Sequence, residues 1–106
     1  MPLTRHFKET VAARVRADAK FAQALLDEAV TLFMNGEPDT AKLVLRDLVN
    51  ATVGFDALAS EIGKPVKSLH RMLSAGGNPT MTNLSAIFAG LKRGLRVEIR
   101  TRVVAA

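Results

Sequence analysis

A basic segment in the second half of the chain carries the side chains whose chemistry is easiest to define. In PVKSLHRML, Lys67, Ser68 and Arg71 recur at a spacing that places them on one side of an α-helix, and Lys64 precedes them on the same side. Lysine and arginine donate hydrogen bonds to phosphate oxygens, and arginine also bonds guanine O6 and N7. The spacing therefore predicts a helix that presents cationic donors to a nucleic acid.

The other side of this helix is apolar. Val66, Leu69 and Leu73 fall together at about 100° per residue, so we expect them to pack inward and hold the helix on the domain. His70 lies at the flank beside Val66, where it can contact either the edge of the core or a phosphate. The competing interpretation of the charged side is the solvated face of an ordinary surface helix.

Two short helices and a tight turn are needed to position this face. Residues 55–62 place apolar side chains at i, i+3, i+4 and i+7, and Gly63 ends the pattern after barely two turns. Pro65 then suits the first turn of a second helix. Two short helices joined by a turn that contains glycine are typical of a helix-turn-helix, whose second helix enters the DNA major groove.

The loop that follows, SAGGNPTMT, offers two more polar candidates. Asn78 and Thr80 could bind backbone phosphates, but Thr80 or Thr82 could equally cap the next helix. That helix, NLSAIFAGLKR, is apolar on one side, and we expect it to end at Gly94.

Helices are also predicted upstream of the helix-turn-helix. Asn35-Gly36 ends one of them and Gly54 ends the next, since glycine and asparagine tolerate the left-handed conformation that follows many helices. The three predicted helices cover residues 4–16, 19–34 and 38–53. We therefore expect a small helical bundle over residues 1–53, followed by the helix-turn-helix region over residues 54–93, within a single domain.

The C-terminal stretch GLRVEIRTRV alternates instead of following a helical period. Apolar side chains fall on one side and charged ones on the other, which predicts a half-buried β-strand over residues 94–106. A lone strand leaves its backbone unpaired, so we expect it to pair with the same strand of a second copy, or to join the sheet of a partner protein. The predicted dimer interface consists of Leu95, Val97, Ile99 and Val103, and the opposite side carries Arg96, Glu98, Arg100 and Arg102.

Charge and composition narrow the classes of function. The 106 residues suffice for one domain, and the net charge of +5 comes entirely from residues 54–106, because residues 1–53 hold equal numbers of acids and bases. The two histidines come without cysteine, tyrosine or tryptophan, so we expect no enzyme, no metal site and no cofactor. Since the N-terminus has no apolar leader and no membrane-length apolar run is present, we expect a cytoplasmic protein.

The segment FDALASEIGKPVKSLHRMLSAGGNPTMTNLSAIFAGL resembles the phage-repressor (Cro/C1, XRE-type) helix-turn-helix. The similarity rests on the pair Leu58-Ala59, on Gly63 in the turn, and on Leu69 followed two residues later by Arg71. Residues 3–59 resemble the HigA-like addiction-module antidote proteins, which are the antitoxins of bacterial type II toxin–antitoxin modules. Together the two resemblances cover nearly the whole chain.

This resemblance implies a mainly α, lambda-repressor-like fold and a homodimer that binds a palindromic operator in its own promoter. It also implies that the protein neutralises a small partner toxin, commonly an mRNA-cleaving enzyme of the RelE-like fold. Recognition helices of the wider family often begin with polar residues, whereas this one begins with Pro65 and Val66. Base reading should therefore fall to Lys67, Ser68 and Arg71, at half-sites about one DNA turn apart.

Two alternatives to the antitoxin remain open. A stand-alone XRE-type transcriptional repressor would bind its operator without a toxin partner, although the charge-neutral N-terminal half leaves room for one. A protein-interaction module would instead use its basic half on an acidic partner, and salt-sensitive binding to duplex DNA would argue against that class. RNA binding by base stacking is disfavoured, because all five aromatic residues are phenylalanines on predicted apolar helix faces.

Overall fold

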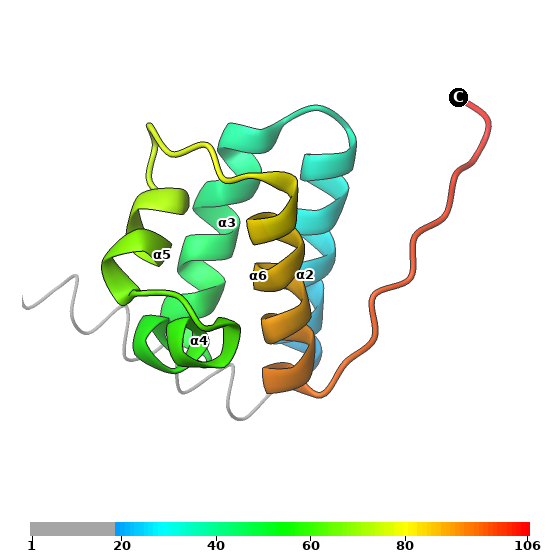
Figure 1. Ribbon diagram of the computed structural model, residues 1–106. Helices are drawn as coiled ribbons and strands as arrows, with labels where there is room; N and C mark the ends of the chain where they lie inside the picture. Colours follow the sequence, from blue (N-terminus) through cyan, green and yellow to red (C-terminus); the bar gives the residue numbers. More distant parts are fainter. Residues whose placement is uncertain (1–18) are drawn as a thin grey trace, which may run out of the picture.

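Helices account for most of residues 19–106, the part of the chain that the computed structural model describes (Figure 1). They are α2 (Ala19–Met34), α3 (Pro38–Ala51), α4 (Phe55–Ile62), α5 (Val66–Met72) and α6 (Met81–Leu95). The mainly helical fold class is thus confirmed, and the helix predicted over residues 4–16 lies outside the described residues. None of the described helices combines the length and the apolar character needed to span a bilayer.

Helices α2 and α3 form an antiparallel hairpin around a tight turn. Gly36 adopts a positive φ of 82°, and the N–H of Glu37 donates to the carbonyl of Leu32 at 2.9 Å, which closes the end of α2. Pro38 then opens α3, where its missing N–H costs no helical hydrogen bond. Both boundaries agree with the prediction from the sequence.

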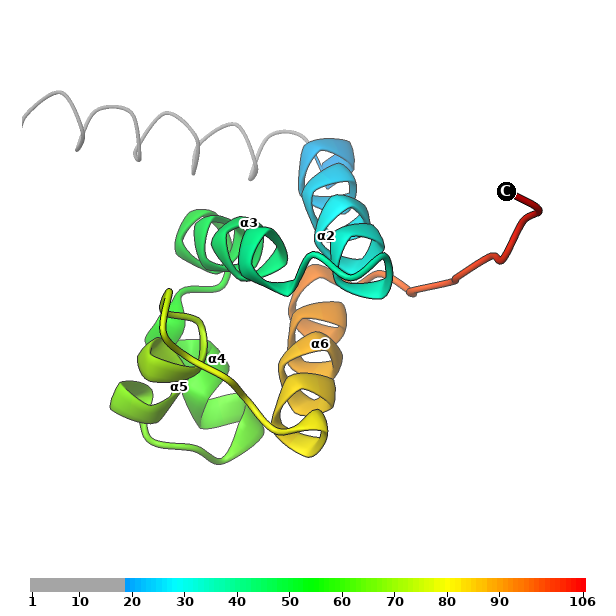
Figure 2. The same cartoon turned by 90° about the horizontal axis from the view of Figure 1, so that it is seen from above.

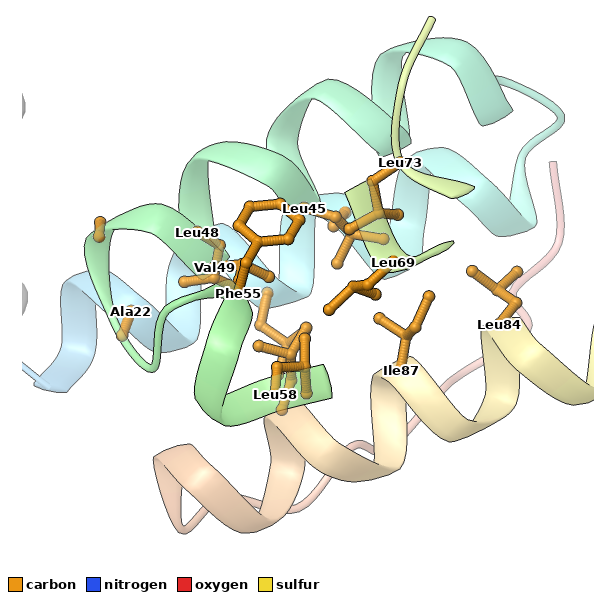
Figure 3. Packing of buried hydrophobic residues seen from close by; sticks show 14 of the residues in the cluster. Ala22, Leu45, Leu48, Val49, Phe55, Leu58, Leu69, Leu73, Leu84 and Ile87 are labelled. Carbon is orange, nitrogen blue, oxygen red and sulfur yellow. The ribbon is translucent and has the colours of Figure 1, made fainter. Parts of the chain in front are cut away.

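The core lies where α3, α4, α5 and α6 converge (Figure 3). Leu45, Leu48 and Val49 of α3 are fully buried, and Ala22, Leu26 and Ala29 of α2 pack into the same cluster. The remaining large side chains that are fully buried are Leu58, Leu69, Leu73, Ile87 and Leu91. Burying each such side chain stabilises the fold by about 1.5–3 kcal/mol, so this shared core holds α4 and α5 and the α2–α3 hairpin in one body.

The C-terminal end of α6 differs from the prediction. Gly94 does not stop the helix, which continues to Leu95 and ends at Arg96 in the left-handed conformation, with φ 57° and ψ 48°. A Cβ on Gly94 would lie 2.6 Å from Cγ1 of Val53, so the glycine allows α6 to approach Val53 closely. The prediction that Gly94 ends the helix is therefore wrong, and Leu95 belongs to α6 and not to a strand.

Residues 96–106, here called the tail, leave α6 as an extended segment without a strand partner within residues 19–106 (Figure 1). A strand requires a paired neighbour, and the helical body supplies none. Val97 and Ile99 are nevertheless partly buried against the core, as is Leu95, while the intervening tail residues are exposed. The predicted alternation of inward and outward side chains is therefore visible in the burial of the residues up to Ile99, whereas Val103 is 99% exposed.

Candidate nucleic-acid interface

The turn between α4 and α5 has the geometry that its glycine allows. Gly63 is left-handed, with φ 67° and ψ 36°, and its N–H donates to the carbonyl of Ser60 at 3.2 Å. The N–H of Lys64 donates to the carbonyl of Ala59 at 3.0 Å, which ends α4. Pro65 is extended, with φ −62° and ψ 143°, and α5 begins directly after it. The predicted arrangement of two short helices and a glycine turn is therefore present.

The apolar side of α5 is anchored in the core. Leu69 and Leu73 are fully buried and point toward Ile87 and Leu45 in Figure 3, and Val66 is partly buried against the same cluster. Anchors one helical turn apart fix both the position and the rotation of a helix about its axis. The opposite side of α5 is therefore held facing outward.

The outward side of α5 is basic. Lys64, Lys67 and Arg71 are exposed, and Ser68 is partly buried between them. No acidic residue occurs in residues 64–80, and none of the three cations forms an ion pair within the described part of the chain. Their charges are thus available to an external anion.

A hollow at the C-terminal end of α5 brings together three of the predicted DNA-binding residues. Ser68 and Arg71 from α5 and Asn78 from the following loop line this space of about 260 Å³, together with Met72, Gly76 and Gly77. A hydroxyl, a guanidinium and a carboxamide that converge in this way are donors suited to a backbone phosphate oxygen. The other predicted DNA-binding residues do not line the hollow; they are Lys64, Lys67, His70 and Thr80.

The loop that forms the hollow packs directly against the end of α5. A Cβ on Gly77 would lie 2.1 Å from the carbonyl oxygen of Arg71 and 2.6 Å from that of Met72, so only glycine fits. The Ser74 hydroxyl donates to the carbonyl of Arg71 at 2.7 Å, and the N–H of Gly77 donates to the carbonyl of Ser74 at 3.0 Å. These contacts position Asn78 relative to Arg71.

Lys42 of α3 is the positioning residue that the sequence reasoning missed. It is only 8% exposed, and its ammonium donates to the carbonyl oxygen of Ala75 at 3.3 Å and to that of Gly77. The exposed carboxylate of Asp39 lies 3.3 Å from the same nitrogen. Lys42 therefore ties the loop after α5 to α3. The available signal was a lysine on the buried face of α3, three residues before Leu45.

His70 and Thr80 make structural contacts within the fold. The imidazole ring of His70 stacks on Phe55, with ring centroids 4.0 Å apart and planes 11° apart, so His70 contacts the edge of the core. The hydroxyl of Thr80 accepts from the N–H of Asn83 at 3.1 Å and caps α6, whereas Thr82 is an exposed residue of the first turn. Of the two interpretations of Thr80, the helix cap is the one that the contacts support.

The candidate interface thus consists of a basic helix face without acidic residues and, beside it, a hollow lined by hydrogen-bond donors. Comparison of the chain with known proteins found no matching family model, no matching curated protein and no matching solved structure.

Proposed function

We propose that this protein is a sequence-specific DNA-binding repressor that inserts α5 into the major groove. The observation that carries this proposal is the fixed orientation of α5, because Leu69 and Leu73 are buried while Lys64, Lys67 and Arg71 face outward without an acidic partner. A DNA-reading helix requires this division between an anchored back and a front of long donors.

Within this proposal, each part of the interface has its own role. Lys67 and Arg71 reach base edges or phosphates, and Ser68 donates or accepts beside them. The hollow between Arg71 and Asn78 receives a backbone phosphate oxygen. Lys64 contributes charge at the start of the helix, and His70, which stacks on Phe55, lies at the flank of the contact.

We further propose that the protein acts in the cytoplasm as the antitoxin of a type II toxin–antitoxin module, as a homodimer that represses its own operon and neutralises a RelE-like mRNA-cleaving toxin. The resemblance of the sequence to HigA-like antidote proteins supports this assignment. An apolar groove of about 330 Å³ bounded by α2, α6 and the tail supports a protein partner. Its lining includes Phe33, Phe88 and the exposed side chains of Met34 and Met81. The alternative is a stand-alone XRE-type repressor without a toxin.

Binding to the protein's own promoter tests the repressor assignment. In a gel-shift titration with that duplex, the wild-type chain should bind with strong salt dependence, and Arg71→Ala should bind about 5–150-fold more weakly, equivalent to roughly 1–3 kcal/mol. The matched control is Lys92→Ala, which removes one exposed cation from α6. Equal losses in the two variants would show that net charge and not the α5 face binds DNA.

Co-expression with the neighbouring gene tests the antitoxin assignment. If a small basic protein encoded there co-purifies with this chain and its mRNA cleavage is suppressed, the antitoxin function stands. If the chain binds its promoter but no encoded neighbour co-purifies with it, the stand-alone repressor is the correct assignment.

A further inference from the structure

The tail is only half covered by the helical body. Val97 and Ile99 are partly buried, but every residue from Arg100 onward is exposed, including Val103 at 99% and Val104 at 72%. Val103 is a further apolar residue on the same side of the extended chain, with Thr101 between it and Ile99. The apolar end of the tail is therefore available to a partner surface.

The backbone of the tail is also open to a partner. The N–H of Val97 donates to the carbonyl of Lys92 at 3.0 Å, but residues 98–106 make no backbone hydrogen bond within the described chain. An extended segment with free N–H and C=O groups is a template for strand pairing. Beside it runs a groove of about 760 Å³ between the tail and α2, lined by Gln23, Leu26 and Val30 among others.

We propose that the tail of a second copy occupies this groove and pairs antiparallel with the first, with Arg100 on the two-fold axis. The inference deepens the proposed function, since it rests on the dimer and specifies its interface. The occupant is identified by symmetry, because each copy supplies both an open groove and an uncovered apolar tail end, so one exchange satisfies both.

The alternation of the tail restricts the possible registers. Directly opposite residues of an antiparallel pair project to the same side, so the inward odd-numbered residues must oppose odd-numbered residues. A slip by one position would turn the arginines toward the body. The axis must then pass through a residue that opposes itself, and the central candidates are Ile99, Arg100, Thr101 and Arg102.

Charge and shape select Arg100 among the four. With Arg100 on the axis, Glu98 opposes Arg102 of the second copy in two equivalent pairs, and Val103 of the second copy covers Val97. This register places a single like-charge pair, Arg100 with itself, across the ribbon. An axis at Ile99 would also give two opposite-charge pairs, Glu98 with Arg100, but it would place Arg96 opposite Arg102 twice. It would also set Val103 against Leu95, which lies in α6. An axis at Thr101 would place Arg100 opposite Arg102 twice, and like charges directly opposite are destabilising. An axis at Arg102 would place Arg102 opposite itself and Glu98 opposite Ala106, without any opposite-charge pair.

This register also orients the two DNA-binding faces. Because the inward residues of both tails project to the same side of the ribbon, both helical bodies lie on that side. Figures 1 and 2 show α5 and the tail on opposite sides of the body. Both α5 helices therefore face away from the ribbon, on one face of the dimer, where a single duplex can contact both.

Disulfide trapping tests the register, because the chain contains no cysteine. Arg100→Cys, Ile99→Cys and Thr101→Cys are each made in the full-length chain and oxidised at low protein concentration. Directly opposite Cα atoms lie about 4.5–5.5 Å apart, within reach of a disulfide, whereas diagonal neighbours lie farther apart. Arg100→Cys should yield the most cross-linked dimer. Dominant cross-linking through position 99 or 101 would overturn the register.

A charge exchange provides the second measurement. Glu98→Arg should raise the dissociation constant of the dimer at least about tenfold by light scattering or ultracentrifugation, since two opposite-charge pairs become like-charge pairs. The double variant Glu98→Arg with Arg102→Glu should restore the dimer. If the dimer were instead restored by combining Glu98→Arg with Arg100→Glu, the axis would lie at Ile99 and the proposal would be overturned.

Failure of this interface can be separated from failure of the repressor function. If the wild-type chain is monomeric, or if no tail variant cross-links and Glu98→Arg leaves the dimer unchanged, the tail is not the interface, whatever the gel shift shows. A tail that instead joined the sheet of a toxin would leave the free chain monomeric, which also overturns the proposal. Loss of DNA binding in Arg71→Ala reports on the α5 face alone.

Discussion

The ammonium of Lys42 lies 3.3 Å from the carbonyl oxygen of Ala75, 33 residues later in the chain, and this contact joins α3 to the loop that follows α5. Lys42→Met should therefore leave the Ala75 and Gly77 carbonyls without their donor and lower the free energy of unfolding by about 1–3 kcal/mol in urea titration. The control is Asp39→Asn, which removes the ion pair with Lys42. Because the side chain of Asp39 is 89% exposed, this loss should lower the free energy of unfolding by less than about 1 kcal/mol. Equal losses would contradict the role given to the buried ammonium.

The close approach of Gly77 to the backbone carbonyl of Arg71 should make the protein sensitive to a side chain at position 77 but not at position 76. Gly77→Ala should destabilise the protein by about 1–3 kcal/mol in thermal unfolding, because the new Cβ meets two backbone carbonyl oxygens that cannot move independently. Gly76→Ala introduces a Cβ with no heavy atom within 4 Å and should be nearly neutral. If both variants unfolded alike, the close approach of this loop to α5 would be wrong.

Lys67 and Arg71 should affect DNA binding in different ways. If Lys67 contacts a phosphate, Lys67→Ala should weaken binding to all sequences and reduce the slope of log K against log salt concentration by about one. If Arg71 reads a base, Arg71→Ala should relax the preference for one base position. Titrations of both variants over a salt series and a set of operator variants separate the two effects. Identical behaviour would contradict this division of roles.

Thr80 can be tested as a helix cap directly. Thr80→Ala should lower the stability by about 0.5–2 kcal/mol, because the N–H of Asn83 loses its acceptor at the start of α6. Thr80→Ser keeps the hydroxyl and should be close to wild type in stability. The matched control is Thr82→Ala, because Thr82 is exposed and is not the residue that caps α6. If Thr80→Ala weakened DNA binding with no loss of stability, the phosphate-contact interpretation would be preferred.

The faces of α5 were predictable from the sequence because helical periodicity is a local property. Val66, Leu69 and Leu73 recur at the spacing that makes one stripe, and burial of the stripe leaves Lys67 and Arg71 outside wherever the helix packs. Gly63 and Pro65 likewise act on their own backbone, so the turn between α4 and α5 could be placed without knowledge of its neighbours.

Other features depended on elements distant in the chain. Gly94 was expected to stop α6. Instead, Val53 lies so close to Gly94 that the absence of a side chain, and not backbone flexibility, is the property of this glycine that matters. Lys42 contacts a loop more than 30 residues away, and no local pattern encodes that distance. The tail shows both limits, because alternation correctly predicted the partial burial of Val97 and Ile99, whereas Val103 is exposed. Pairing of the tail backbone requires a partner that the described helical body does not provide. Helical periodicity, a local property, thus determined which helix faces are apolar. Only the tertiary structure determined which elements those faces contact, as in the packing of α3 against the loop after α5 and of α6 against Val53.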